Sequence, residues 1–185
     1  MTSARRCLLG LLVLAAVLVP VMSAQAAPDA SAAVPAVGAM APDFSLTTNE
    51  GHAAALKDFQ GKWVVLYFYP KDFTGGCTLE AHNFQRDLAK YEKANAVILG
   101  VSVDTAESHK DFCTKEGLAF KLFSDPDAKV STQYGSLMEY NGAKLAARNT
   151  FIVDPKGKIA KVFTGVKPAS HSEEVLTALA SLQAH

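Results

Sequence analysis

Apolar runs and amphipathic segments alternate along most of the chain, and they predict strands and helices in turn. Residues 63–69, with the sequence W-V-V-L-Y-F-Y, form a continuous β-branched and aromatic run, and residues 96–103 form a second, mainly apolar run. Such runs are typical of strands that are buried on both faces of a sheet. Between them, residues 79–93 have helical spacing, with Phe84 and Tyr91 on one side. A helix that joins two strands in this way favours a parallel strand pair.

The remaining chain continues the alternation in shorter segments. The further elements that we expect are strands at 44–47 and 120–123, a helical turn at 55–59, and helices at 107–116 and 128–134. Two more strands, 149–153 and 159–164, flank the residues D-P-K-G, which are typical of a hairpin turn. Ser170, with Glu173 three residues later, predicts the N-cap of a last helix that ends near residue 182.

This order of elements indicates the fold class. We predict a single α/β domain of thioredoxin-like outline, with a mixed central sheet flanked by helices. The crossover helices account for parallel strands, and the closing hairpin adds antiparallel ones. A chain of 185 residues is long enough for one domain with a sizeable core.

The first residues have the pattern of a secretory signal peptide. Arg5 and Arg6 precede an apolar run at 8–19, and an A-Q-A sequence supplies small residues for cleavage. The run is too short for a membrane-spanning helix, which needs about 20 apolar residues. We therefore predict a signal peptide at 1–26 and export, with the bacterial periplasm as the expected destination. An uncleaved anchor is the alternative.

The chain that remains after cleavage is expected to have two parts. Residues 27–38 are small and interrupted by prolines, which predicts a flexible lead-in, and residues 39–185 would form the folded domain. The whole chain has a formal net charge of zero, so the loss of Arg5 and Arg6 leaves a slight excess of acidic residues. No run of basic residues suggests a nucleic-acid partner.

The cysteines point to the chemistry. Cys7 lies in the predicted signal peptide, which leaves Cys77 and Cys113 in the exported chain. In an oxidising compartment a pair of thiols is a disulfide candidate by default. A core of this size makes a purely stabilising disulfide unnecessary, and this favours redox chemistry.

Cys77 lies where a strand gives way to a helix, in the stretch Y-P-K-D-F-T-G-G-C-T-L-E. The unpaired N–H groups and the positive dipole end of a first helical turn favour the thiolate over the thiol. Gly75 and Gly76 allow the backbone to come close to a bound molecule, and Thr74 offers a hydroxyl. From this placement alone, a nucleophile and a thiol that packs against the strand end are equally good interpretations.

A motif of three residues, and the family resemblance that it carries, decides between them. Pro70, Thr74 and Cys77 form the pattern P-x-x-x-T-x-x-C, and the sequence around them resembles the bacterioferritin-comigratory, or Q-type, branch of the peroxiredoxins. Other segments that resemble this branch are A-P-D-F at 41–44, V-S-V-D at 101–104 and R-N-T-F-I-V-D at 148–154. The resemblance covers about residues 38–182.

The resemblance implies a thiol peroxidase that needs neither a metal nor a cofactor. Cys77 would be the peroxidatic cysteine, Thr74 would hydrogen-bond the peroxide, and Pro70 would shield the site. Arg148, from a distant strand, would keep the thiolate ionised and polarise the O–O bond, because a guanidinium stays charged at any relevant pH. We expect the backbone of Gly76 to approach the substrate.

Three further positions bear on the site. Glu80 matches an acidic position of this branch, where the resemblance implies that it orients Arg148; an ordinary first-turn helix carboxylate is the alternative. Gly75 stands where a proline is usual in the family. His82 stands where many members have a resolving cysteine, and we interpret it as an exposed helix histidine.

Cys113 is then the one other thiol of the exported chain that could condense with a sulfenic acid at Cys77. Some Q-type members place their resolving cysteine in the corresponding helix. The resemblance therefore implies an atypical two-cysteine mechanism, with an intramolecular Cys77–Cys113 disulfide in a monomer that a thioredoxin-like donor recycles. The alternative is a packed helix cysteine, in which case an external thiol would complete a one-cysteine cycle.

Competing functions fit less well. A thiol–disulfide oxidoreductase needs Cys-x-x-Cys, and a copper carrier needs two close cysteines with a histidine; neither spacing occurs. His52, His109 and His171 lack metal-ligand spacing, and we expect them at the surface or in caps. We expect Phe73 and Phe151 to line the peroxide site. The expected partners are a peroxide and a thiol reductant, without nucleic acid and without a membrane once the signal is cleaved.

Overall fold

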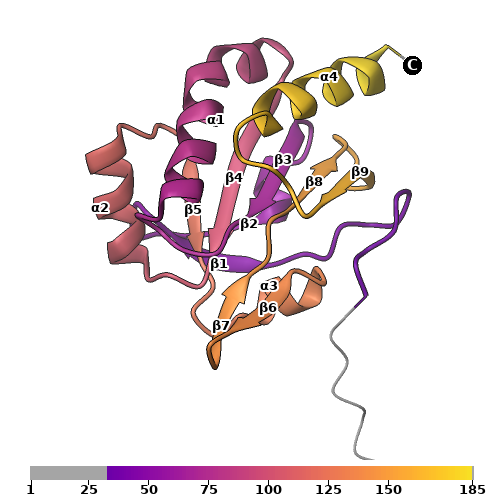
Figure 1. Ribbon diagram of the computed structural model, residues 1–185. Coiled ribbons are helices and arrows are strands. Elements are labelled where there is room, and N and C mark those ends of the chain that lie inside the picture. The colour runs from indigo at the N-terminus through magenta and orange to yellow at the C-terminus, as the bar shows by residue number, and fades with distance from the viewer. Residues whose placement is uncertain (1–32, 185) are drawn as a thin grey trace, which may run out of the picture.

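The computed structural model describes residues 33–184, so the predicted signal peptide and residues 27–32 of the lead-in lie outside the described residues. The strands of the main sheet are β1 (Ser45–Thr48), β2 (Ala53–Ala55), β3 (Trp63–Phe68), β4 (Ala96–Ser102), β5 (Lys121–Ser124), β8 (Asn149–Val153) and β9 (Ile159–Thr164). Across this seven-stranded sheet the order is β2-β1-β5-β4-β3-β8-β9 (Figure 1). The helices are η1 (Leu56–Phe59), α1 (Gly75–Lys93), α2 (Ala106–Glu116), α3 (Lys129–Gln133) and α4 (His171–Gln183).

The centre of the sheet is formed by the two longest apolar runs. β3 and β4 are parallel, with Trp63 opposite Ala96 and Phe68 opposite Val101. On its other edge β3 pairs with the antiparallel strand β8. Because β3 has neighbours on both edges and helices on both faces, its side chains from residue 64 onward are all buried. This explains why the run is apolar without interruption.

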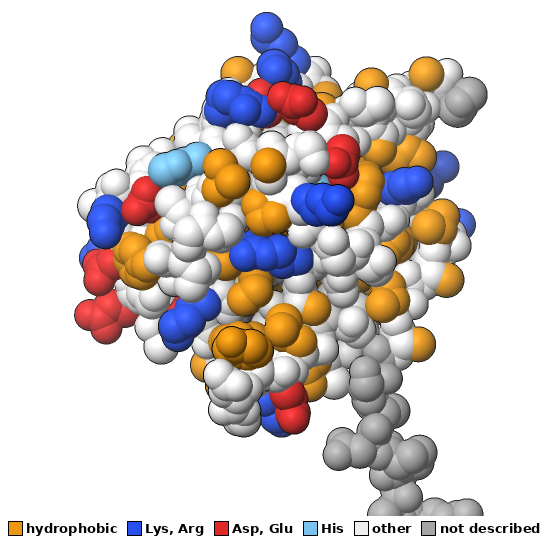
Figure 2. Space-filling model, viewed as in Figure 1, with side chains coloured by type: hydrophobic (Ala, Val, Ile, Leu, Met, Phe, Trp, Pro, Cys, Tyr) orange, Lys and Arg blue, Asp and Glu red, His pale blue; other side chains and the backbone are white. Residues whose placement is uncertain are grey.

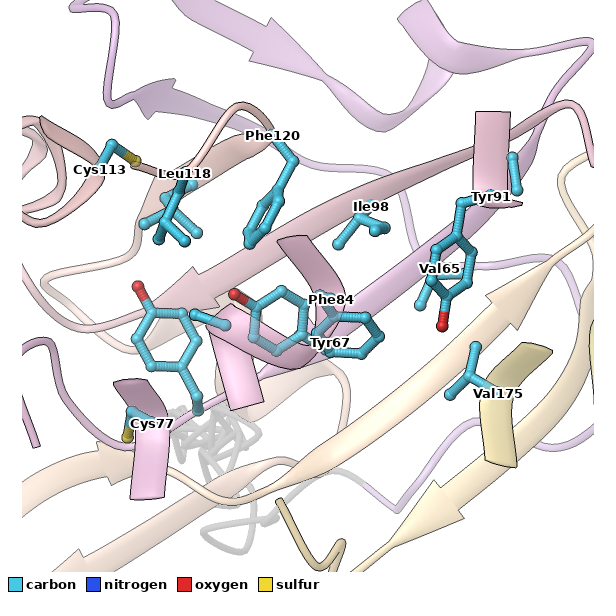
Figure 3. Close-up of a cluster of buried hydrophobic side chains, with 14 of the residues drawn as sticks. Val65, Tyr67, Cys77, Phe84, Tyr91, Ile98, Cys113, Leu118, Phe120 and Val175 are labelled. Carbon is cyan, nitrogen blue, oxygen red and sulfur yellow. The ribbon is translucent and has the colours of Figure 1, made fainter. Parts of the chain in front are cut away.

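Two layers of side chains pack against the sheet. Val65 and Tyr67 of β3 point to the face that α1, α2 and α4 cover, where Phe84 and Val175 are fully buried (Figures 1 and 3). On the opposite face, β3 packs with η1 and α3 through a second cluster. Its largest fully buried side chains are Leu66, Phe68, Leu99, Phe123, Tyr134 and Phe151. Each fully buried side chain of this size contributes about 1.5–3 kcal/mol.

The predicted fold class is confirmed. The parallel pairs β3–β4 and β4–β5 and the antiparallel pair β8–β9 make the sheet mixed, as the order of elements indicated. The helix that was predicted at 107–116 begins one residue earlier, and Gly117 ends it in the left-handed conformation with φ of 67°. Only glycine takes this conformation without steric cost.

Several local expectations were wrong. α1 begins at Gly75 and not at residue 79, because packing overrides the low helix propensity of a glycine pair. Strand β2 and the hairpin of β6 (Leu137–Tyr140) and β7 (Ala143–Ala146) were not predicted. Ser170 is the N-cap of α4, as predicted, but it forms no side-chain capping hydrogen bond, and its hydroxyl donates to the Glu174 carboxylate at 2.5 Å.

The surface carries mixed charges. On the face shown in Figure 2, Lys and Arg side chains are interspersed with Asp and Glu. Hydrophobic side chains gather near β6 and β7, where Tyr140 is 62% exposed. Within residues 33–184, no helix is long and apolar enough to span a bilayer.

Candidate active site

The loop between β3 and α1 brings the chain sharply into the helix. Phe73 has φ of 59°, a left-handed conformation that is strained for a bulky side chain. Its ring packs edge-on against Phe112 of α2, with centroids 5.1 Å apart, and the Lys115 ammonium lies 5.4 Å from the ring centroid. These contacts hold Phe73 in place, and Thr74 follows it directly as the N-cap of α1.

Cys77 lies in the first turn of α1 and is 1% exposed. The Thr74 hydroxyl lies 2.8 Å from the Sγ atom, and Nη2 of Arg148 donates to the same sulfur at 3.2 Å. Although Thr74 is the N-cap, its side chain makes no hydrogen bond to the helix backbone. Its hydroxyl is therefore available to hydrogen-bond the Cys77 sulfur. The sulfur therefore lies at the positive N-terminal end of a helix, beside a guanidinium and a hydroxyl.

The Thr74 hydroxyl can serve both protonation states of the sulfur. It has one proton, and it also lies 2.9 Å from the Lys71 carbonyl oxygen. With a thiol at Cys77, the hydroxyl donates to the carbonyl and accepts from the S–H group. With a thiolate, it turns its proton to the sulfur. The two acceptors allow this change by rotation of one bond.

Glu80 holds Arg148 from one turn further along α1. Nη1 of Arg148 donates to Oε2 of Glu80 at 2.7 Å, while Nη2 reaches Cys77. Glu80 is 1% exposed, and its Oε1 atom has no hydrogen-bond partner among the described residues. Burial raises the pKa of the Glu80 carboxyl to about 7, and the Arg148 guanidinium acts in the opposite direction. The guanidinium thus links a buried carboxyl with the sulfur.

Gly76 makes room for this arginine. A Cβ atom at Gly76 would lie 2.8 Å from Nη2 of Arg148, which is too close for ordinary contact. Gly76 thus has a steric role, in addition to the predicted approach of its backbone to the substrate. Gly75 differs, because a Cβ atom there would meet nothing within 4 Å. Pro70 is half-buried at the start of the loop, directly after the buried Tyr69.

Cys113 lies in the second half of α2 and is 7% exposed. It shares a hydrophobic cluster with Cys77, and both cysteines are free thiols. In Figure 3 Cys113 lies beside Leu118 and is separated from Cys77 by other side chains of the cluster. Burial, with a smaller effect from the Asp72 carboxylate, raises the pKa of the Cys113 thiol to about 12. The predicted disulfide therefore requires movement of the chain and stays a prediction.

Other expectations for the site need correction. His109 and His171 are fully buried and not at the surface. Phe151 lies in the cluster on the opposite face of the sheet, so it does not line the site of Cys77. His82, by contrast, is an exposed residue of α1, as predicted, and its Nε2 atom lies 2.9 Å from the Glu116 carboxylate at the end of α2.

Sequence reasoning missed one buried polar residue next to the site. Asp72, in the same loop as Thr74, is 4% exposed and accepts hydrogen bonds from Tyr69, Ser108 and His109. The sequence contained a signal for this residue. Asp72 directly follows a buried strand and Pro-Lys, which is an unusual position for a charge that faces inward. Its partners could not be read from the sequence.

Residues 37–162 match the family model described as AhpC/TSA. Because this match covers more than half of the chain, the protein belongs to the AhpC/TSA family, as the fold and the environment of Cys77 indicate.

Within this family the chain is a peroxiredoxin of the Bcp and Q type. Peroxiredoxin Bcp of Xanthomonas campestris pv. campestris is 40% identical over 141 residues, which are 74% of this chain and 88% of that protein. Chloroplastic peroxiredoxin Q of Sedum lineare is 40% identical over 147 residues, 79% of this chain and 78% of that protein.

Solved structures agree with this assignment. The crystal structure of a PrxQ mutant from Xylella fastidiosa superposes with a TM-score of 0.76 at 34% identity, covering 81% of this chain and 98% of that one. The bacterioferritin comigratory protein of Xanthomonas campestris gives a TM-score of 0.70 at 38% identity, with 75% and 90% covered. The predictions of family and fold are thereby confirmed.

Proposed function

We propose that the protein reduces hydrogen peroxide and organic hydroperoxides through Cys77, and that Cys113 of the same chain resolves the product. The observation that carries the first part is the convergence of Thr74 and Arg148 on the Cys77 sulfur, at 2.8 and 3.2 Å. Organic hydroperoxides are included because the published structures of the Xanthomonas campestris relative concern its alkyl peroxide reduction activity.

The first step forms a sulfenic acid. The Cys77 thiolate attacks the terminal oxygen of a peroxide R–O–O–H, an S–O bond forms and the O–O bond breaks. The OH group goes to sulfur, and the leaving RO⁻ takes a proton from water to become ROH. Negative charge moves from the sulfur toward the leaving oxygen, so donors that are already in place stabilise the transition state. Arg148 and the Thr74 hydroxyl are such donors.

The second step joins the two cysteines. The Cys113 sulfur attacks the Cys77 sulfur, an S–S bond forms, the S–O bond breaks, and the oxygen leaves as water with the Cys113 proton. A thiol with a pKa of about 12 is a poor nucleophile at neutral pH. Unwinding of α2 would expose Cys113 and remove the burial that raises this pKa. We therefore propose that resolution is coupled to local unwinding.

The cycle closes when an external dithiol reduces the disulfide and is itself oxidised. We propose a thioredoxin-like protein as this donor, and the periplasm as its compartment, because of the secretory pattern at residues 1–26. N-terminal sequencing of the protein from a periplasmic extract tests the export. A start near residue 27 is the expected result.

We also propose that the protein is a monomer, and gel filtration of the reduced protein tests this.

Intact mass and peptide mapping test the chemistry. After one equivalent of hydrogen peroxide, the reduced protein should lose two hydrogens, with the Cys77 and Cys113 peptides linked. The Cys113→Ser variant should instead gain one oxygen at Cys77 and lose turnover with the dithiol donor. If its turnover equals that of the wild type, the cycle is of the one-cysteine kind. An unchanged Cys77 in the wild type would contradict peroxidase function itself.

A further inference from the structure

A buried polar cluster ties the loop that precedes Cys77 to the first half of α2. Asp72 of the loop accepts from the Ser108 hydroxyl at 2.7 Å and lies 2.9 Å from Nδ1 of His109. The Tyr69 hydroxyl donates to its other oxygen at 2.7 Å. Both members of the Asp72–His109 pair are buried, with side-chain exposures of 1% and 0%. We call Asp72, Ser108 and His109 the α2 anchor.

Both ring nitrogens of His109 have hydrogen-bond partners. Nδ1 of His109 faces the Asp72 carboxylate, and Nε2 lies 3.2 Å from the Phe123 carbonyl oxygen, so both ring nitrogens face acceptors. Burial acts to raise the pKa of Asp72, but hydrogen bonds from His109, Tyr69 and Ser108 outweigh it and lower the pKa. The Asp72 carboxylate is therefore charged.

The loop side of the anchor is itself fixed to the sheet. The Asp72 N–H donates to Oδ2 of Asp104 at 2.9 Å, and Ser102 donates to the same oxygen at 2.6 Å. Ser124 of β5 donates to the Asp104 carbonyl. The ammonium of Lys71, which is largely exposed, lies 3.6 Å from Oδ1 of Asp104. The first half of α2 is thus held to the ends of β4 and β5 through buried contacts.

The polar contacts of the second half of α2 lie near the surface, and its buried side chains, Phe112 and Cys113, are apolar. His82 of α1 meets Glu116 at 2.9 Å, with the histidine side chain 49% exposed. After the helix, the Ala119 N–H donates to Oε1 of Gln85 in a solvent-exposed hydrogen bond. Exposed pairs of this kind stabilise a helix little, whereas a buried polar group that loses its hydrogen-bond partner destabilises the fold more strongly. The buried polar contacts of α2 are thus concentrated in its first half.

We propose that Asp72 and His109 are positioning residues for the disulfide-forming step. They keep the first turn of α2 folded while the segment from residue 110 onward unwinds, and this directs Cys113 to the Cys77 sulfenic acid. Cys113 is four residues after His109, and four extended residues span at most about 14 Å. The anchor therefore keeps the thiol close to the loop that leads to Cys77. This inference rests on the proposed two-cysteine function.

Two substitutions of His109 separate the role of the anchor from simple packing. In His109→Asn the amide nitrogen occupies the place of Nδ1 and keeps the bond to Asp72. In His109→Gln it occupies the place of Nε2, keeps the bond to Phe123, and leaves Asp72 without the histidine. Glu116→Gln, at the exposed end of the helix, is the matched control.

Rapid-quench mass spectrometry after a peroxide pulse measures both steps. We expect sulfenic acid formation at Cys77 to stay within about twofold of wild type in all three variants. Disulfide formation should slow at least fivefold in His109→Gln only, and more Cys77 should then be oxidised further to sulfinic acid at a given peroxide dose. His109→Asn and Glu116→Gln should form the disulfide at the wild-type rate or faster.

Hydrogen exchange of the disulfide form gives an independent readout. In the wild type and His109→Asn, amides of residues 110–118 should exchange fast while 105–109 stay protected. In His109→Gln the fast segment should extend to residue 105. If this variant does not fold, Ser108→Ala removes one anchor bond and should slow disulfide formation at least twofold.

Two results would overturn the inference. One is a His109→Gln variant with the wild-type rate of disulfide formation and the wild-type exchange boundary. The other is a wild-type protein that forms no Cys77–Cys113 disulfide. The second result would also overturn the proposed resolving step. The two results are distinguished because the second is observed in the wild-type protein, without any substitution, whereas the first is observed in the variant.

Discussion

Nη2 of Arg148 lies 3.2 Å from Sγ of Cys77, although 71 residues separate them in the chain. The same guanidinium donates to Glu80 through Nη1, so two donor groups of one planar cation serve two partners at once. Lysine offers a compact ammonium and cannot reproduce this geometry.

Arg148→Lys should therefore slow the reaction of Cys77 with hydrogen peroxide by about 10²-fold, the size expected for the loss of a donor that stabilises developing charge. The rate is measured by competition with a second peroxidase. Lys144→Gln, at an exposed position of β7, is the control and should have no effect. A variant Arg148→Lys with the wild-type rate would contradict the role given to Arg148.

Glu80 gives the site a dependence on pH. Its carboxyl has a raised pKa of about 7, so ionisation of Glu80 strengthens its hold on Arg148 as the pH rises through this value. We expect the wild-type rate with peroxide to have an inflection near pH 7 that Glu80→Gln lacks. The measurement is a pH–rate profile of both proteins from pH 5.5 to 8.5. Superimposable profiles would contradict a role for Glu80 ionisation in the peroxide reaction.

The same pKa predicts an opposite trend for stability. An acid whose folded pKa is raised binds more protons in the folded state, so its contribution is present below pH 4.5 and is lost as the pH rises through about 7. Relative to Glu80→Gln, the free energy of unfolding of the wild type should fall across this window. Urea titrations at several pH values measure the difference.

The two glycines before Cys77 should respond differently to alanine. At Gly76 a Cβ atom would come within 2.8 Å of Nη2 of Arg148, so Gly76→Ala should displace the guanidinium and slow the peroxide reaction at least tenfold. At Gly75 there is open space, so Gly75→Ala should leave the rate unchanged. Equal effects of the two substitutions would show that Arg148 tolerates the added methyl group.

His171 predicts a loss of stability in mild acid. It is packed between the rings of Phe84 and Phe163, and burial lowers its pKa to about 4. A base with a depressed folded pKa stabilises the fold above the unfolded pKa of about 6.5 and loses this contribution as the pH falls toward 4. Over this window the wild type should lose up to about 3 kcal/mol relative to His171→Gln. Parallel unfolding curves for the two proteins would contradict the assignment.

The sequence alone was sufficient for the strands and helices whose side-chain pattern is strong. The apolar runs that became β3 and β4 and the helical spacing of α1 were predicted from single segments, because each burial pattern repeats within one element. The spacing of Pro70, Thr74 and Cys77 was also local, so it indicated the family and the reactive cysteine.

Features that depend on distant partners were decided only by the tertiary structure. The start of α1 at Gly75 and the hairpin of β6 and β7 have weak local signals, so packing determined them. No local pattern could show that His109 is buried against Asp72, or that its second nitrogen meets a carbonyl of β5. Charged groups of this kind are stable inside a protein only with partners, and the folded sheet brings those partners from other elements.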